Sequence, residues 1–220
     1  MTDLSAAGAG IGLAVGAAAA PLVAALVAHP PLSPNAQPPA RHPAGRVRLP
    51  VATVTVVACG LTGTRVGLRW PLPAFLVFSV GLATLGLCDL YWRVLPKRVV
   101  YPTWAAGLAG LSLAAGLDHH WSSLDNAASA GAGLFAIFAI LHLAVPSSIA
   151  FGDARLAGPV GTALGWWGGS TVIIGVTAIF VAAAIVSLIL LPLGRLDRRG
   201  SIPLGTYLGT GVAIVIWIWH

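Results

Sequence analysis

Two aspartates stand at the ends of long apolar stretches, and their type and placement make them the residues of this chain best suited to chemistry. Asp89 ends one apolar stretch, and Asp153 stands just ahead of another, in Ala150-Phe151-Gly152-Asp153-Ala154-Arg155-Leu156. Only 8% of the residues are charged, and all six acids are aspartates. A carboxylate at the edge of a membrane span is costly and therefore indicates a functional residue. Two of them on facing helix ends predict an aspartyl protease that works at a membrane surface.

The two aspartates are expected to differ in protonation. Asp89 lies at the C-terminal end of its apolar run, where the helix dipole and partial burial favour the neutral acid. Asp153 lies at the start of the next run, where the dipole and free backbone N–H groups favour the ionised base. Aspartic proteases need such a split. Taken alone, Asp153 is also explained as a simple N-cap, and Asp89 as a partner of Arg93, a pair worth only about 0.2–0.5 kcal/mol.

Composition places the chain in a membrane. Of its 220 residues 57% are hydrophobic, and the mean hydropathy is +0.89, whereas soluble domains are about 45–50% apolar. We therefore predict an all-α, polytopic transmembrane helical bundle forming one domain over residues 1–220. About eight spans are expected, at residues 5–28, 50–63, 71–88, 102–117, 126–149, 157–168, 170–193 and 204–219.

The basic residues predict the orientation of this bundle. If eight spans alternate, ten of the twelve Lys and Arg fall in loops on one side, and only Arg65 and Arg69 fall on the other. The positive-inside rule assigns the first side to the cytoplasm, which puts both termini outside and both aspartates on the cytoplasmic face. Because the basic residues are spread over several short loops, the pI near 10.4 does not indicate a nucleic-acid partner.

Two further segments have a structural interpretation. Residues 29–49 are rich in proline without apolar periodicity, which predicts an irregular cytoplasmic loop. Glycines four residues apart predict close helix packing, inside this bundle or between two copies. They occur at Gly8, Gly12 and Gly16, at Gly161 and Gly165, and at Gly205 and Gly209.

Other chemically capable residues are better explained as structural. Cys59 and Cys88 lie in apolar segments without a CxxC pattern, which favours buried small hydrophobes. Asp118-His119-His120 with Asp125 could bind a metal by residue type, although a solvated loop is the preferred interpretation. A structural histidine is the preferred interpretation of His142, with a proton relay as the alternative. Ser147-Ser148 lacks a His–Asp partner on its loop. No metal and no organic cofactor are expected.

Three motifs together resemble the type IV prepilin peptidases, a family of polytopic membrane aspartyl proteases. The family's first motif is an Asp followed by a short run to Ile-Pro-Asn, and here Asp89 is followed by Leu95-Pro96-Lys97. The second is Gly-x-Gly-Asp-x-Lys-Leu, and here it runs from Ala150 to Leu156, with Gly152 and Arg155 at the matching positions. The third, Ile-Pro-Phe-Gly-Pro, is matched loosely by Ile202-Pro203-Leu204-Gly205. The resemblance covers residues 85–215.

The resemblance implies a function and a location. Asp89 and Asp153 would be catalytic, with Pro96, Gly152 and Arg155 in supporting positions, and the substrate would be a prepilin-like precursor whose leader is cleaved at the cytoplasmic surface. The location would be the bacterial cytoplasmic (inner) membrane, crossed several times. The family's bifunctional members carry two CxxC pairs in a methyltransferase domain, which residues 29–49 are too short to hold, so peptidase activity alone is implied. The chain departs from the family at Ala150, Lys97 and Arg155.

Two other functions are compatible with the same residues. A small transporter or channel could use Asp89 and Asp153 to bind a cation or a proton. Such proteins place their acids near the bilayer midplane on broken helices, whereas these acids lie at the ends of spans. An inactive peptidase-like scaffold in pilus assembly is the second alternative.

Overall fold

A computed structural model describes residues 2–29, 44–92, 94–145 and 150–190, and within these ranges the chain is entirely helical. Seven helices follow one another in the order α1 (Thr2–Ala28), α2 (Ala44–Val66), α3 (Leu72–Trp92), α4 (Lys97–Asp118), α5 (Trp121–Ala144), α6 (Phe151–Gly165) and α7 (Gly169–Leu190). Five of them, α1 to α5, are long and apolar enough to cross a membrane. The all-α membrane-type fold is therefore as predicted.

The predicted spans agree with the helices in order, but the count of about eight spans is not confirmed, because among the described helices only α1 to α5 are long and apolar enough to cross a membrane. The first seven correspond to α1 to α7, and the eighth, 204–219, lies outside the described residues. Several boundaries were wrong, and α4 and α5 each begin five residues earlier than predicted. Residues 44–49 belong to α2 rather than to an irregular loop, with Pro50 inside the helix. Helix α6 begins at Phe151 rather than at 157 and has only 15 residues, because its polar first turn does not show in an apolar run.

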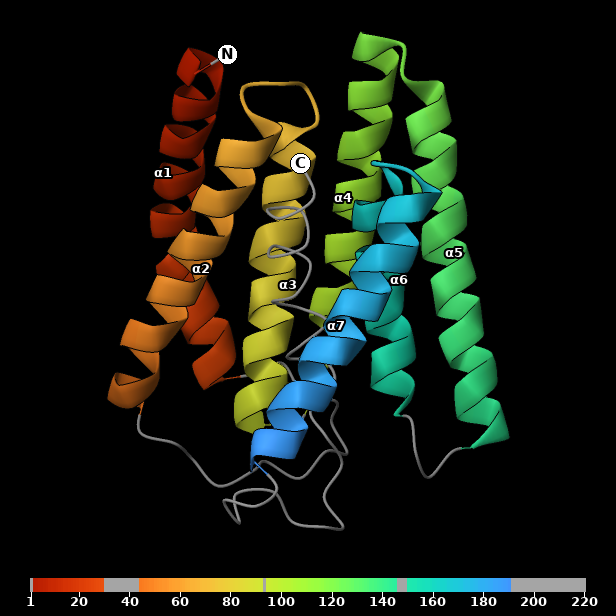
Figure 1. Cartoon of the computed structure of the whole chain (residues 1–220). Coiled ribbons are helices and arrows are strands. Elements are labelled where there is room, and N and C mark those ends of the chain that lie inside the picture. Colours follow the sequence, from red (N-terminus) through yellow and green to blue (C-terminus); the bar gives the residue numbers. More distant parts are fainter. Residues whose placement is uncertain (1, 30–43, 93, 146–149, 191–220) are drawn as a thin grey trace.

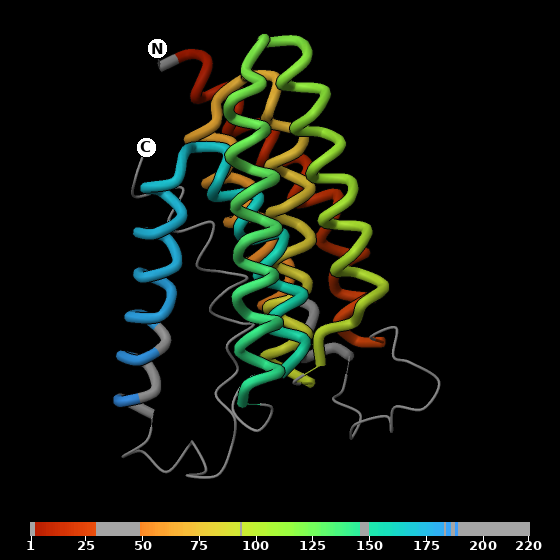
Figure 2. Tube along the Cα trace, turned by 90° about the vertical axis from the view of Figure 1, so that its right-hand side faces the viewer, coloured from red at the N-terminus to blue at the C-terminus, as the bar shows by residue number. Residues whose placement is uncertain are grey.

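Neighbouring helices run in opposite directions, up and down the bundle (Figure 1). One end of the bundle holds the end of α3 and the beginnings of α4 and α6, and we name it the aspartate end. The opposite end holds the short turns between α2 and α3, α4 and α5, and α6 and α7. Seen from the side, α7 stands at one flank of the bundle (Figure 2). The alternation brings Asp89 and Asp153 to the same end, as the sequence predicted.

Helix α3 is the centre of the bundle. Its span is the most buried of the five, and Phe75, Phe78, Leu82 and Leu85 have at most 2% of their surface exposed. It contacts α1, α2, α4 and α6. Polar residues on this helix and its neighbour α2 are satisfied locally, since the Thr62 and Ser79 hydroxyls share a hydrogen bond of 2.7 Å. A rigid central helix fixes the position of whatever its last turn carries.

Glycines allow the closest helix pairs to form. A Cβ atom added at Gly8 or Gly12 of α1 would collide with the backbone of α2, at Gly63 and Cys59 respectively. Added at Gly161 or Gly165 of α6, it would collide with the backbone of α5. Both described glycine patterns therefore serve packing inside the bundle, which confirms that interpretation. Gly205 and Gly209 lie outside the described residues.

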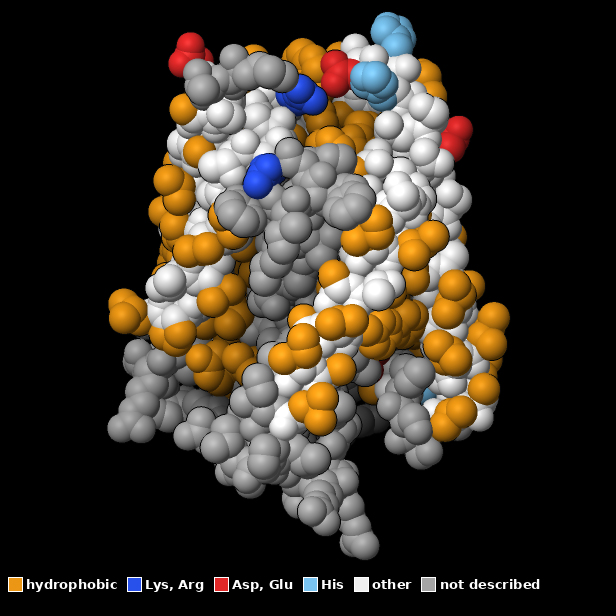
Figure 3. Space-filling model, in the orientation of Figure 1, with side chains coloured by type: hydrophobic (Ala, Val, Ile, Leu, Met, Phe, Trp, Pro, Cys, Tyr) orange, Lys and Arg blue, Asp and Glu red, His pale blue; other side chains and the backbone are white. Residues whose placement is uncertain are grey.

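Among the described residues, charged side chains lie at both ends of the bundle. Acidic, basic and histidine side chains gather at the opposite end (Figure 3), where Asp3, Arg65 and Arg69 belong to α1, α2 and the following turn. Described basic residues at the aspartate end are Lys97, Arg98 and Arg155. Proteins that cross membranes keep their basic loops in the cytoplasm. The aspartate end is therefore the one expected to face the cytoplasm.

This arrangement predicts the result of topology mapping. A reporter fused after Leu95 or after Arg155 should report the cytoplasm, because both positions lie at the aspartate end. A reporter fused after Gly67 or after Ser122 should report the other side. Alkaline phosphatase and green fluorescent protein fusions give opposite signals and serve as paired measurements. Opposite locations for Leu95 and Arg155 would contradict the fold.

Two neighbouring glycines of α1 provide a test of the packing. Gly12→Ala should lower the melting temperature, since the added methyl group meets the Cys59 backbone, and overpacking of this kind costs about 1–3 kcal/mol. Gly10→Ala is the matched control, because nothing lies within 4 Å of the added atom. The control should be neutral or gain up to about 1 kcal/mol from helix propensity. Thermal unfolding in detergent measures both, and equal effects would refute the proposed contact.

Candidate functional site

The end of α3 is held in place by a hydrogen bond to α1. The indole Nε1 of Trp92 donates to the backbone carbonyl oxygen of Val27 over 2.6 Å. Val27 itself is fully buried, among residues of α1, α2 and α3 that include Cys88. Asp89 lies one turn before Trp92 and is 7% exposed. Its carboxyl group is thus fixed to a rigid helix end in mostly apolar surroundings.

Pro96 sets the direction of the chain after α3. It is the N-cap of α4, with extended backbone angles, and it is buried. Its carbonyl oxygen accepts hydrogen bonds from the N–H groups of Val99 (2.9 Å) and Val100 (3.2 Å). The residue before a proline is restricted to extended conformations, so Leu95 and Pro96 form a short, stiff turn. What the structure gives for Pro96 is a structural position, in which it shapes the turn between α3 and α4.

Asp153 lies inside α6 rather than ahead of it. It is the third residue of the helix, and the N-cap is Ala150, which makes no capping hydrogen bond through a side chain. The backbone N–H of Asp153 donates to the Ala150 carbonyl oxygen over 3.0 Å. The interpretation of Asp153 as a simple N-cap is therefore wrong. Its side chain is 8% exposed, which is unusual for an aspartate without a structural task.

Gly152 is the point at which the two motifs meet. A Cβ atom added there would lie 3.0 Å from Cδ1 and 3.3 Å from Cβ of Leu95. The absence of a side chain at Gly152 therefore lets the α3–α4 turn rest against the first turn of α6. Because Leu95 follows Asp89 and Gly152 precedes Asp153, this contact brings the two aspartate-bearing segments together.

The two carboxyl groups interact electrostatically. The pKa of Asp153 is raised from 3.8 to about 6. Burial is the largest cause and the nearby Asp89 carboxylate the second, while a backbone hydrogen bond at Ala150 lowers the pKa. Asp153 was expected to favour the ionised form, and the structure gives the opposite direction. Desolvation and a like charge outweigh the helix dipole here. Because the pKa of Asp153 is higher in the folded than in the unfolded chain, its protonation stabilises the fold. This contribution to the free energy of unfolding is complete below about pH 4 and is lost as the pH rises through 6.

Arg155 is held by an aromatic ring beside the aspartates. Its guanidinium carbon lies 4.5 Å from the centre of the Phe151 ring, and its Nε atom is buried without a hydrogen-bond partner. The same Phe151 ring lies 5.4 Å from the ring of His142. The His142 side chain therefore belongs to the aspartate end, next to the second motif. No pattern within one segment indicates this neighbourhood, since His142 and Phe151 belong to different helices.

The remaining candidates do not form sites in the described part of the chain. His119 has a left-handed backbone (φ 57°) and ends α4, so Asp118-His119-His120 is a tight helix turn. Among the described residues no group of three or more His, Cys, Asp or Glu side chains could hold a metal ion. Cys59 and Cys88 are free and buried, as expected of small hydrophobes. Ser147-Ser148 lies outside the described residues.

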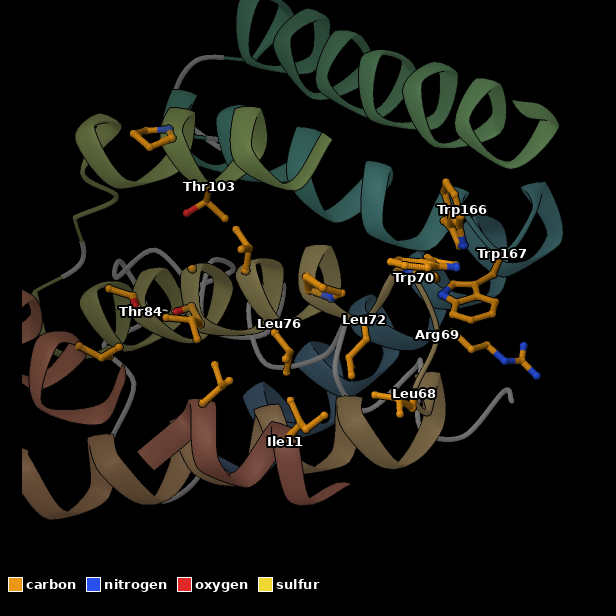
Figure 4. A pocket seen from close by; sticks show the side chains of 18 of the residues that line it. Ile11, Leu68, Arg69, Trp70, Leu72, Leu76, Thr84, Thr103, Trp166 and Trp167 are labelled. Carbon is orange, nitrogen blue, oxygen red and sulfur yellow. Dashed lines mark hydrogen bonds between the residues drawn. The ribbon is translucent and has the colours of Figure 1, made fainter. Parts of the chain in front are cut away.

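A large cavity lies away from the aspartates and was not predicted. Its volume is about 1600 Å³, and its described walls come from α1, α3 and α4 and from the turns at the opposite end. Neither Asp89 nor Asp153 is among the described residues that line it. Figure 4 shows Trp70, Trp166 and Trp167 together at one end of this cavity. No single sequence pattern identifies a space whose walls come from separate helices.

Comparisons with protein-family models, with curated proteins and with solved structures gave no match. A functional assignment therefore depends on the residues of this chain and on their placement.

The coupling between the two carboxyl groups is directly measurable. Asp153 should titrate near pH 6, and Asp89→Asn should move its midpoint down, because removal of a negative neighbour favours the ionised form. The midpoint should stay above 3.8, since burial remains. Infrared spectra of protein labelled with ¹³C-aspartate, with Asp153→Asn as the reference, give this titration. Asp125→Asn at the opposite end is the matched control, and an equal shift there would contradict the pairing.

Proposed function

We propose that this chain is a membrane aspartyl endopeptidase that hydrolyses one peptide bond of a membrane-inserted precursor at the aspartate end of the bundle. The observation that carries the proposal is the pairing of two buried aspartates, Asp89 from α3 and Asp153 from α6, at one end. Burying one carboxyl group in an apolar bundle is costly, and burying a second beside it is costlier. A pair of this kind is the acid–base device of aspartic proteases.

The pair supplies both functions that hydrolysis requires. Like charges held close together do not both ionise readily, so the pair retains one proton up to about pH 6, where Asp153 titrates. The ionised member takes a proton from a water molecule, whose oxygen attacks the carbonyl carbon of the peptide. The protonated member donates to the carbonyl oxygen. When the C–N bond then breaks, a proton passes to the departing amine nitrogen.

The resemblance to prepilin peptidases specifies the substrate within this proposal. Asp89, Pro96, Gly152, Asp153 and Arg155 stand at positions that match the family's motifs. The substrate is accordingly a pilin-like precursor with an apolar N-terminal helix and a short basic leader. Cleavage takes place at the cytoplasmic surface, in keeping with the basic residues at the aspartate end. In this scheme Leu95, Pro96 and Gly152 position the aspartates.

Replacing either aspartate should abolish cleavage. Asp89→Asn and Asp153→Asn keep the size and hydrogen bonding of the side chain but cannot exchange a proton. Loss of acid–base catalysis lowers rates by about 10²–10⁴-fold. A co-expressed prepilin with a tagged C-terminus reports the reaction as a mobility shift on an immunoblot. The matched controls are Asp118→Asn and Asp125→Asn at the opposite end, which should process the precursor at the wild-type rate.

The same assay separates the alternatives. Near-normal cleavage by either aspartate variant would refute the paired-carboxyl mechanism. Absence of cleavage by the wild-type chain, with proton or cation flux that depends on both aspartates in proteoliposomes, would favour the transporter. Absence of cleavage and of flux, with loss of pilus assembly in a deletion strain, would favour the scaffold. Because the mechanism uses no metal, added chelator should leave cleavage unchanged.

A further inference from the structure

The large cavity is built like the binding site of an amphipathic molecule. Its charged and histidine lining side chains, Arg69, Asp118 and His120, belong with Ser123 to the turns and helix ends at the opposite end of the bundle. Three tryptophans, Trp70, Trp166 and Trp167, share this end, as Figure 4 shows. Tryptophan is enriched where a membrane meets water. The mouth of the cavity therefore lies at the membrane surface.

The body of the cavity is apolar. Below the mouth its walls are mostly aliphatic side chains of α1 and α3, such as Val15, Leu22, Leu76 and Val80. Two threonines, Thr84 and Thr103, also line it, and the Thr84 hydroxyl donates to the carbonyl oxygen of Val80 over 2.7 Å. An occupant must therefore have a polar group at one end and an apolar body.

The cavity extends along most of the bundle. Its lining residues run from Leu72 to Thr84 on α3 and from Val99 to Asp118 on α4, which at ~1.5 Å per residue is about 18 Å and about 28 Å. The charged side chains of the described lining lie at one end only. A lipid with its headgroup at that end and its acyl chains along the helices matches this asymmetry.

The charges at the mouth specify the headgroup. A guanidinium group is a good partner for a phosphate, with which it forms paired hydrogen bonds. Arg69 is exposed at the mouth, beside the indole groups (Figure 4). Asp118 also lines this end, and its carboxylate repels a purely anionic headgroup but attracts an amine. The pair complements a headgroup that carries both a phosphate and an amine.

We propose that this cavity is a binding site for an amine-bearing phospholipid of the leaflet at the opposite end, with the phosphate at Arg69, the amine at Asp118 and the acyl chains between α1, α3 and α4. The site does not involve the aspartate pair and does not depend on the proposed peptidase activity. A bound lipid fills a space of about 1600 Å³ that separates α1 from α4. It thereby supports the bundle between α1 and α4, which do not pack directly against each other.

Native mass spectrometry of the purified full-length chain tests this proposal. The probes are phosphatidylethanolamine, phosphatidylglycerol and, as a control without phosphate, diacylglycerol of the same acyl chains. The wild type should retain one phosphatidylethanolamine molecule in preference to the other two. Val77→Trp places an indole in the cavity, since Val77 lines it and is 38% exposed, and should reduce retention at least tenfold. The matched control is Val57→Trp on α2, which is 50% exposed and outside the lining.

Headgroup variants test the two charges separately. Arg69→Gln should weaken both phospholipids at least tenfold and leave diacylglycerol unchanged, whereas Arg65→Gln, outside the lining, should change nothing. Asp118→Asn should remove the preference for phosphatidylethanolamine over phosphatidylglycerol, with Asp125→Asn as the control. Equal retention by the Val77→Trp and Val57→Trp variants, or equal retention of diacylglycerol and phosphatidylethanolamine, would overturn the proposal. Arg69 is exposed and its Gln variant is expected to fold, so a folding defect in Val77→Trp leaves the test intact.

Discussion

The aspartate end depends on one close contact, in which Leu95 rests against Gly152. This contact is possible because Gly152 has no side chain, and it joins the turn after α3 to the first turn of α6. Each of these segments carries one of the two aspartates. If the contact were lost, Asp89 and Asp153 would remain on their own helices but would no longer share an environment. The paired carboxyl groups are therefore a product of packing between glycine and leucine.

Burial gives this pair its chemical character. An isolated aspartate on a surface is ionised at neutral pH and has little use as an acid. Here desolvation and a like-charged neighbour raise the pKa of Asp153 to about 6, close to the range in which acid–base catalysts work. The helix dipole at the start of α6 favours the opposite direction but is the weaker effect. The rest of the bundle maintains this environment, since α6 packs mainly against α5 and α4 and is thereby held beside the end of α3.

The two ends of the bundle differ in design. The aspartate end is tightly packed, with Trp92 bonded to Val27 and Pro96 capping α4. The opposite end opens into an apolar cavity with tryptophans and a few charged groups at its mouth. Chemistry that needs fixed geometry suits the first end, and adaptable binding of a flexible apolar molecule suits the second. The central helix α3 contributes to both, since its first turns line the cavity and its last turn carries Asp89.

The sequence by itself determined the helical membrane-type fold, the order of the first seven helices and the placement of Asp89 and Asp153 at one end. These follow from apolar length and from the alternation of spans, which are local properties of the chain. It also indicated the glycines that pack α1 against α2. Only the tertiary structure decided that Asp153 lies inside α6 with a raised pKa, that His142 and Arg155 share the ring of Phe151, and that a cavity separates α1 from α4. Each of these depends on side chains from different helices, and no pattern within one segment records which distant residues will surround it.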